Sequence, residues 1–306
     1  MALTVVGSIA FDSVRTPFGE RDRMLGGSAV HFALAASFFT EVRVVGPVGG
    51  DLDPDQIEML RARGIDTTDV ERVEQGKTFE WRGHYDHDLN VAHTDETLLG
   101  VFADFDPKLS ERSRGAEVLF LGNIQPDLQR RVRRQCASAR LAALDSMNLW
   151  IETTRDALLA VVGEVDCVLL NDYEIRMLTD EPNLARAARK LIERGPRIVV
   201  AKRGEYGAAL FTPDSLFALP GFLLEEVRDP TGAGDSFAGG LLGYLDGCGA
   251  YEPDEGQLRR AMAYGTVLAS FNVEQFGTER VQELSGADVS ERYQQLRAMT
   301  HFDVPE

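Results

Sequence analysis

The stretch DPTGAGD at residues 229–235 runs directly into SFAGGLLGYLDG, which has the apolar pattern of a helix. Its glycines allow the backbone to turn so that successive N–H groups converge, and the following helix adds the positive end of its dipole. Asp235 stands at the same helix start, where we expect an ionised carboxylate that takes a proton from an attacking hydroxyl. An anion hole beside a general base is what phosphoryl transfer to an alcohol requires. The alternative is a tight turn in which Asp235 only caps the helix.

The length and composition indicate one large, soluble α/β domain, or one such domain with a small appendage. The chain has 306 residues, 44% of them hydrophobic and 26% charged, and contains no apolar run long enough to span a membrane. Its 32 Lys and Arg against 49 Asp and Glu give a net charge of −17, which makes nucleic acid a poor partner. The three cysteines lack CxxC spacing, and the first residues lack the pattern of a signal peptide, so we expect a cytoplasmic protein with reduced thiols.

Apolar, β-branched runs alternate with segments of helical period along most of the chain. This succession predicts an α/β fold with a central, mostly parallel sheet covered by helices on both faces. The expected strands are residues 3–8, 42–48, 117–123, 140–145, 166–171 and 197–202. The expected helices include residues 53–64, 126–139, 154–165, 183–195, 255–273 and 285–299.

Two segments, residues 14–27 and 76–100, break this rhythm and predict short antiparallel strands that form an inserted lid. The core then comprises residues 1–13, 28–75 and 101–306. Alternation in the second segment places Phe79, Trp81 and Tyr85 on one face. This aromatic stripe either stacks on the base of a substrate or is buried between the lids of a homodimer.

Four other motifs fail on spacing or context. GKT at 76–78 lacks the first glycine of a P-loop, and GAG at 232–234 lacks the third glycine and the position of a dinucleotide fingerprint. His84, His87 and His93 lie close together in sequence, but on a strand His84 and His87 point to opposite faces, which favours surface residues over a metal site. The acidic stretch at 51–58 is typical of a helix start rather than a calcium loop.

Five motifs, in order along nearly the whole chain, resemble the ribokinase-like (PfkB) family of carbohydrate and nucleoside kinases. They are GSIAFDSV (7–14), GGSAVHFALA (26–35), NDYE (171–174), AKRGEYGA (201–208) and DPTGAGDSFAGG (229–240). The resemblance implies that Asp235 is the catalytic base and that Gly232, Ala233 and Gly234 form the anion hole.

The resemblance also implies a substrate site and a nucleotide site. Asp12 would hold substrate hydroxyls, Gly26 and Gly27 would let the substrate approach the backbone, and Glu174 with Asn171 would organise magnesium and phosphate. The further expected substrate contacts are His31, Trp81, Asn123 and Asn148. The further expected nucleotide contacts are Lys202, Gly204, Gly207, Thr231 and Gly265, the last lying with Ala261 and Ala269 on a helix face where small residues leave room for adenine.

The expected function is therefore ATP-dependent, Mg²⁺-requiring phosphorylation of the primary hydroxyl of a ribose-like sugar or a nucleoside. The alternatives are a different polyol, such as fructose or inositol, and a regulatory relative that binds nucleotide without turnover. His31 stands where many relatives have Asn, and Trp150 stands where an Arg often follows the strand-end motif DSMN (145–148), which disfavours a phosphorylated substrate. Asp229 and Thr231 could line a site for a monovalent cation such as K⁺.

Overall fold

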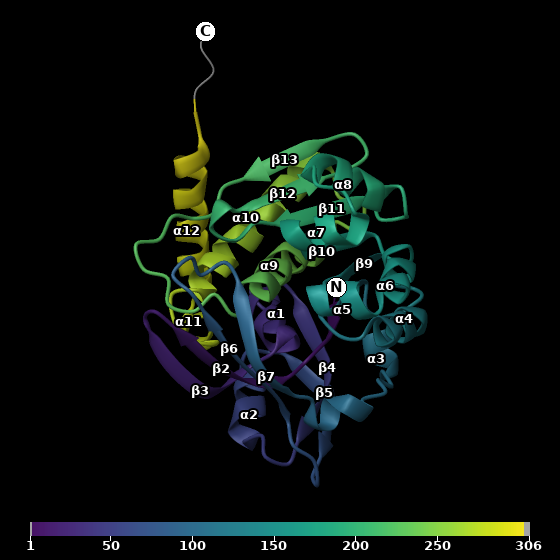
Figure 1. Ribbon diagram of the computed structural model, residues 1–306, viewed down its shortest axis with the longest axis vertical. Coiled ribbons are helices and arrows are strands. Elements are labelled where there is room, and N and C mark those ends of the chain that lie inside the picture. The colour runs from purple at the N-terminus through teal and green to yellow at the C-terminus, as the bar shows by residue number, and fades with distance from the viewer. Residues whose placement is uncertain (1, 303–306) are drawn as a thin grey trace.

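The computed structural model describes residues 2–302 and contains two sheets (Figure 1). The main sheet has nine strands in the order β13-β12-β11-β10-β9-β8-β1-β4-β5. All neighbouring pairs from β11 to β5 are parallel, and β12 and β13 are antiparallel additions at one edge. The chain leaves β1 in one direction to β4 and β5 and later returns to β8 on its other side. The β1/β8 boundary is thus the switch point where α/β sheets of this kind bind ligands.

The strands of the main sheet are β1 (Ala2–Val6), β4 (Glu41–Gly49), β5 (Asp66–Val73), β8 (Val118–Leu121), β9 (Leu141–Leu144), β10 (Cys167–Asn171), β11 (Ile198–Lys202), β12 (Ala208–Phe211) and β13 (Leu216–Leu219). The α-helices are α1 (Ser28–Ala36), α2 (Pro54–Ala62), α3 (Glu111–Arg114), α4 (Pro126–Gln135), α5 (Asn148–Thr153), α6 (Arg155–Val162), α7 (Asp172–Thr179), α8 (Leu184–Ile192), α9 (Ala233–Gly247), α10 (Glu255–Asn272), α11 (Glu279–Glu283) and α12 (Gly286–Thr300). Short 3₁₀ helices occupy η1 (Gly100–Asp104) and η2 (Gly204–Tyr206).

Alternate side chains of the buried strands enter separate cores on the two faces of the sheet. In β1, Leu3 and Val5 join the core beneath α1, α9 and α10, whereas Val6 joins the core beneath α4, α6, α7 and α8. Because helices cover both faces of the sheet, its strands are nearly continuous apolar runs. This is why the strands could be predicted from the sequence. The predicted fold class is confirmed, and each expected strand and helix has a counterpart within a few residues.

The second sheet has the order β3-β2-β6-β7 and crosses the front of the molecule in Figure 1. Its strands are β2 (Ala10–Thr16), β3 (Gly19–Gly26), β6 (Phe79–Tyr85) and β7 (Ala92–Leu98). The β2/β3 and β6/β7 pairs are antiparallel, as expected, but β2 and β6 pair in parallel. The sheet also starts at Ala10, inside the segment 1–13 that the sequence assigned to the core, because the apolar run of β1 continues into β2 with only a short break.

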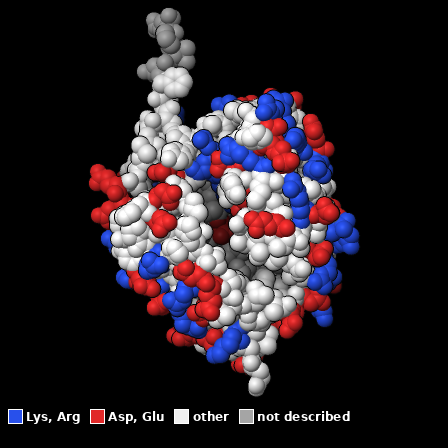
Figure 2. Space-filling model, viewed as in Figure 1, with Lys and Arg blue, Asp and Glu red and all other residues white. Residues whose placement is uncertain are grey.

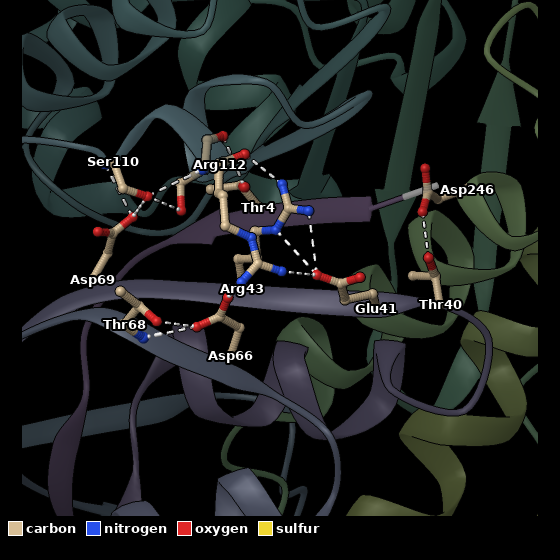
Figure 3. A network of polar contacts seen from close by, with 11 residues as sticks. Thr4, Thr40, Glu41, Arg43, Asp66, Thr68, Asp69, Ser110, Arg112 and Asp246 are labelled. Atoms are coloured by element: carbon tan, nitrogen blue, oxygen red, sulfur yellow. Dashed lines mark hydrogen bonds and ion pairs between the residues drawn. The ribbon is translucent and has the colours of Figure 1, made fainter.

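A polar network ties the amino-terminal ends of β4 and β5 to the segment around α3 (Figure 3). Glu41 accepts hydrogen bonds from Arg43 at 3.2 Å and Arg112 at 3.0 Å, and Arg112 also contacts Asp66 at 3.1 Å. The Ser110 hydroxyl donates to Asp69 at 2.8 Å. This network lies at the end of the strands opposite to their carboxyl ends, so it belongs to the framework of the sheet.

Among residues 2–302, no helix combines the length and hydropathy that crossing a bilayer requires.

Candidate active site

Several polar residues and a glycine lie where the strands of the main sheet end. Gly122 and Asn123 follow β8, Asp145 follows β9, Asn171 ends β10 and Lys202 ends β11. Figure 2 shows a hollow near the middle of the corresponding face, with acidic atoms at its floor.

The turn before α9 is held from inside the protein. Gly232 has φ 75°, which favours glycine, and a Cβ there would overlap the His31 ring. The Asp229 carboxylate is fully buried and accepts hydrogen bonds from the amides of Thr231 and Gly277, each at 2.9 Å. These contacts fix the turn from which α9 begins.

The Ala233 amide corrects one expectation about the anion hole. This N–H donates to the Pro230 carbonyl at 3.2 Å, within the turn, so it is not free to receive an anion in this geometry. The Gly232 and Gly234 amides make no hydrogen bond to another backbone group among the described residues. Two of the three predicted amides are therefore available as donors.

Asp235 lies in the first turn of α9 beside a buried ion pair. Lys202 Nζ contacts Asp145 Oδ2, and a Cβ built on Gly234 would lie 3.0 Å from the same ammonium group. Burial, with the nearby charge of Asp145, raises the pKa of Asp235 to about 7, although Lys202 opposes the shift. The sequence analysis expected an ionised Asp235 and gave no sign of this upward shift, which depends on neighbours from other segments of the chain.

Asp12, on β2, lies under the two glycines that open α1. Its Oδ2 accepts a hydrogen bond from the Gly27 amide at 3.1 Å, and a side chain on Gly26 would overlap the Asp12 carboxylate. Gly27 has φ 91°, and its Cβ would lie 2.5 Å from the Ser8 carbonyl oxygen. Glycines at these two positions thus allow Asp12 and the chain after β1 to pack against the backbone before α1. Burial raises the pKa of Asp12 to about 7.

His31, on α1, lies between Asp12 and the turn before α9. Its ring is only 2% exposed, and its Nδ1 lies 2.8 Å from Asn272 Oδ1. Its Nε2 lies 4.0 Å from Asp12 Oδ2. Burial lowers the pKa of His31 to about 4, so the ring is neutral at pH 7.

The lid presents aromatic side chains to the same region. Trp81 pairs in register with Asp12 across the parallel β2/β6 ladder, so the two side chains project from the same face of the lid sheet. The Trp81 indole donates to Thr94 at 3.1 Å and covers Gly83. The Tyr85 hydroxyl lies 3.2 Å from the Thr231 hydroxyl, in the turn before α9. Of the predicted stripe, Phe79 instead packs edge-on against Phe102 in η1.

The tip of the β6–β7 hairpin reaches across to the turn after β11. Asn90 donates to the Glu205 carboxylate at 3.1 Å and accepts from the Glu205 amide at 3.3 Å. Gly204, at φ 55°, lies directly under Asn90, and Gly207, at φ 87°, allows the turn to pass close to the backbone of residue 219. In this structure the lid spans the hollow from one side to the other.

Two predicted substrate contacts differ in their surroundings. The Asn123 side-chain oxygen accepts a hydrogen bond from the Trp150 indole at 2.9 Å, which fixes the orientation of the amide. Asn148 is the first residue of α5 and is exposed to solvent. The sequence analysis mentioned Trp150 only because an arginine often stands at this position. In the structure its indole orients the Asn123 side chain.

Asn171 and Glu174 form a capping box at the start of α7. The Glu174 amide donates to Asn171 Oδ1 at 2.7 Å, and the Asn171 amide donates to Glu174 Oε2 at 2.8 Å. Burial raises the pKa of Glu174 to about 7, with Lys202 opposing the shift. One carboxylate oxygen of Glu174 is therefore used in the cap.

Gly265 does not serve the role that was expected of it. A Cβ at this position would lie 2.8 Å from the Phe237 carbonyl oxygen and 3.1 Å from the Phe237 ring. The glycine therefore allows α10 to pack closely against α9 and leaves no room for a nucleotide on that side. A small residue in a helix is compatible both with close helix packing and with access for a ligand. The sequence does not distinguish these two roles, whereas the position of the neighbouring helix does.

Two residues of the site were missed. Asp145 holds Lys202, and its signal was present, since an aspartate directly after a buried strand lies at the carboxyl edge of the sheet. Asn272 is fully buried and contacts His31, Ser236 and Thr231. It is the last residue of an apolar helix, and no motif marks it.

Comparison with known proteins agrees with this geometry. The family model described as pfkB family carbohydrate kinase matches residues 8–283. A cytidine kinase of Thermococcus kodakarensis is 31% identical over 255 residues, covering 80% of this chain and 89% of the relative. A nucleoside kinase of Methanothermobacter thermautotrophicus is 26% identical, covering 90% of this chain and 91% of the relative.

Solved structures share the fold. A nucleoside kinase of Burkholderia thailandensis in complex with inosine has a TM-score of 0.80 at 19% identity, covering 97% of this chain and 99% of the other. An E. coli protein called a putative ribokinase II, in complex with ATP and Mg²⁺, has a TM-score of 0.79 at 18% identity, covering 96% and 98%. From the extent of the family match and the cytidine kinase relative, we conclude that this chain belongs to the pfkB family of carbohydrate kinases and is a phosphotransferase that acts on an alcohol group.

Proposed function

We propose that the protein transfers the γ-phosphoryl group of ATP to the primary hydroxyl of a nucleoside or a ribose-like sugar. The observation that carries this proposal is Asp235, whose pKa of about 7 suits a general base, in the first turn of α9 beside Gly234 and Lys202. In the proposed reaction, Asp235 takes the proton of the substrate hydroxyl as its oxygen attacks phosphorus. The amides of Gly232 and Gly234 and the Lys202 ammonium stabilise the negative charge of the transferring group.

We propose a nucleoside as the preferred substrate. Asp12 and His31 supply buried polar atoms for sugar hydroxyls, and Trp81 projects from the same face of the lid sheet as Asp12, where an indole would stack on a base. The two relatives described above are called cytidine kinase and nucleoside kinase. Asn123 and Asn148 complete the proposed substrate contacts. A free polyol remains the alternative if the indole serves only lid packing, and a regulatory relative would be expected to lack the base or the anion hole.

The residues near β10 and β11 fit a nucleotide and Mg²⁺. Mg²⁺ is commonly held by one or two carboxylates together with phosphate oxygens and water, and Glu174 and Asp145 supply carboxylates beside Lys202. We therefore assign Glu174 to the metal, with Asn171, Lys202, Gly204, Gly207 and Thr231 on the nucleotide side. When bound, the metal offsets charge on the phosphate oxygens.

A monovalent cation such as K⁺ would suit the loop at Asp229. This carboxylate is fully buried, its pKa is raised by burial, and no cationic side chain among the described residues pairs with it. A cation bound by nearby carbonyl groups would offset the buried charge and support the turn before α9. Activity in KCl compared with choline chloride tests this assignment.

Two properties of the whole protein complete the proposal. The edge strands β3 and β7 of the lid sheet are largely exposed, so two lids could pair in a homodimer. The free thiols of Cys136, Cys167 and Cys248 and the need for ATP suit the cytoplasm. The net charge of −17 argues against nucleic acid as a partner.

The experiment that tests the function is a screen of ATP consumption over adenosine, inosine, cytidine, ribose, fructose and inositol, with Asp235→Asn as the matched control. We expect turnover with at least one nucleoside and loss of that turnover in the variant. Turnover of fructose or inositol alone would replace the nucleoside assignment, and nucleotide binding without turnover of any acceptor would favour the regulatory alternative.

A further inference from the structure

A buried set of hydrogen bonds links the turn before α9 to the proposed substrate pocket through Asn272. The Asn272 amide nitrogen lies 2.7 Å from the Thr231 carbonyl oxygen, and its side-chain oxygen lies 3.0 Å from the Ser236 hydroxyl and 2.8 Å from His31 Nδ1. A carbonyl oxygen can only accept, so the amide NH₂ must face Thr231. The side-chain oxygen of Asn272 must then face Ser236 and His31.

This orientation determines where the proton of His31 resides. Because the Asn272 oxygen can only accept, His31 Nδ1 must carry the hydrogen. The neutral ring therefore presents a lone pair at Nε2. No described residue gives Nε2 a hydrogen bond, although the ring is only 2% exposed, and the nearest charged atom is Asp12 Oδ2 at 4.0 Å.

The Nε2 lone pair and the Asp12 carboxyl group thus face one another at 4.0 Å, and no hydrogen bond joins them. A buried acceptor without a partner is costly, so a ligand that supplies donors would be favoured here. Two neighbouring hydroxyls of a sugar supply one O–H for Nε2 and one for the Asp12 carboxylate. With the other tautomer, Nε2–H would point towards the Asp12 carboxylate, 4.0 Å away, and the pair would have no acceptor at Nε2.

We propose that Asn272 is a positioning residue that fixes the Nδ1–H tautomer of His31 and so makes the Asp12–His31 pair selective for a vicinal diol. The inference deepens the proposed function and rests on it for the identity of the ligand. The selected substrates are those with a ribose ring, and 2′-deoxyribose would leave one buried acceptor without a partner. The same Asn272 also holds the Thr231 carbonyl, and the His31 ring packs under Gly232, so diol recognition and the anion hole share one support.

The tautomer can be measured in the free protein, without any enzyme assay. The chain has five histidines, and ¹⁵N NMR of the imidazole nitrogens, with His31→Gln to assign the signal, shows which nitrogen of His31 carries the proton. We expect Nδ1–H in the wild type and in the control Ser236→Ala, which removes the other donor to the same Asn272 oxygen. We expect Asn272→Ala to shift the population towards Nε2–H. A wild-type Nε2–H tautomer, or an unchanged tautomer in Asn272→Ala, would overturn the proposal.

The second readout is discrimination between a ribonucleoside and its 2′-deoxy counterpart, measured as the ratio of their kcat/KM values. Loss of one hydrogen bond corresponds to about a tenfold fall in this ratio in Asn272→Ala, and we expect Ser236→Ala to keep the wild-type ratio. If Asn272→Ala does not fold, Asn272→Asp retains the acceptor for Nδ1–H and loses the donor to Thr231, so it should keep the ratio while lowering kcat. A folded Asn272→Ala with an unchanged ratio, or an Asn272→Asp with a collapsed ratio, would contradict the proposal.

These outcomes can be distinguished from the case in which the nucleoside assignment itself is wrong. If the protein phosphorylates only free sugars, the substrate assignment is wrong, and the ratio for ribose over 2-deoxyribose then tests the diol selectivity in its place. The tautomer measurement is independent of both.

Discussion

Three carboxyl groups around the hollow, Asp12, Glu174 and Asp235, have pKa values raised to about 7, each chiefly by burial. Near neutral pH, a base with such a pKa combines a useful ionised fraction with enough basicity to accept a proton. Lys202 opposes the shift of both Glu174 and Asp235, so removal of its charge would raise their pKa values further. Single residues thus set the pH at which the site can work.

The pH dependence of kcat/KM follows from the ionisation of Asp235. The base is active only when deprotonated, so we expect kcat/KM to rise with pH up to about 7 and to level off above it. Well below that pKa the rise should approach tenfold per pH unit. The measurement is kcat/KM from pH 5 to 9 with saturating ATP and Mg²⁺, and a profile that is flat across this range, or that falls as pH rises, would contradict the assignment.

Glu174→Gln tests the proposed metal ligand while keeping the helix cap, because a glutamine oxygen can still accept from the Asn171 amide. Loss of a carboxylate that binds or orients Mg²⁺ should raise the Mg²⁺ concentration for half-maximal rate by about 10- to 100-fold. Glu181→Gln is the matched control, since it removes a carboxylate beyond the other end of α7 that pairs with Arg186. A titration in which both variants match the wild type would remove Glu174 from the metal site.

At the scale of elements, we expect the lid sheet to determine the choice between substrates. Its strand β6 presents Trp81 on the face that carries Asp12, and the hairpin tip contacts Glu205 on the opposite side of the hollow. The alternative role of the aromatic stripe, as a seam between two lids, predicts a different consequence of its removal.

Trp81→Ala should therefore weaken the use of a nucleoside by about 1 to 3 kcal/mol in kcat/KM, the scale of base stacking on an aromatic ring, with little effect on a free pentose. Phe79→Ala is the control, because Phe79 lies on the same strand as Trp81 but packs on Phe102 in η1. Activity is measured with both substrates alongside the molecular mass in solution. Equal loss for both substrates together with dissociation of a dimer would show that the stripe is a seam.

The elements that the sequence predicted are those with one dominant signal. Buried parallel strands such as β10 and β11 gave uninterrupted apolar runs, and the helix expected at 285–299 is α12, with Ser285 as its N-cap. By contrast, β5 is largely polar, so its sequence resembles a loop. The parallel pairing of β2 with β6 depends on contacts between segments far apart in the chain, which local pattern cannot show.

Among the site residues, those within a recognisable sequence motif were predicted, and those whose role depends on tertiary contacts were not. Asp12 and Lys202 were singled out from their sequence motifs, and in the structure Asp12 contacts the Gly27 amide while Lys202 contacts Asp145. Gly265 was assigned wrongly because a glycine in a helix carries no information about which neighbour needs the space. Asn272 was not predicted because its importance arises only from three partners on three different segments.

At the scale of the whole molecule, the carboxyl groups of the site lower the free energy of unfolding as the pH rises towards neutrality. Carboxyl groups whose folded pKa is raised are favoured in their neutral form, so their contribution to stability is present below the unfolded pKa of about 4 and is lost as pH rises through about 7. The chain as a whole carries a charge of −17, which adds self-repulsion above neutral pH.

Asp235→Asn should accordingly stabilise the protein at pH 8 and have less effect at pH 5, where the wild-type carboxyl is already neutral. We expect an increase in Tm of at least about 2 °C at pH 8, the shift that 1 kcal/mol produces in a large domain. The exposed Asp214→Asn is the control and should show no difference between the two pH values. Equal Tm values for Asp235→Asn and wild type at pH 8 would contradict the electrostatic account of the site.

The most direct test of the account is the kinetics of the same variant. Asp235→Asn keeps the size and polarity of the side chain but removes its ability to accept a proton, so ATP should bind with nearly unchanged affinity while kcat falls by about 10² to 10⁴. ATP affinity is measured by calorimetry and kcat with the best acceptor from the screen. The account predicts intact binding with lost turnover, and a variant that retains more than half of the wild-type kcat would contradict it.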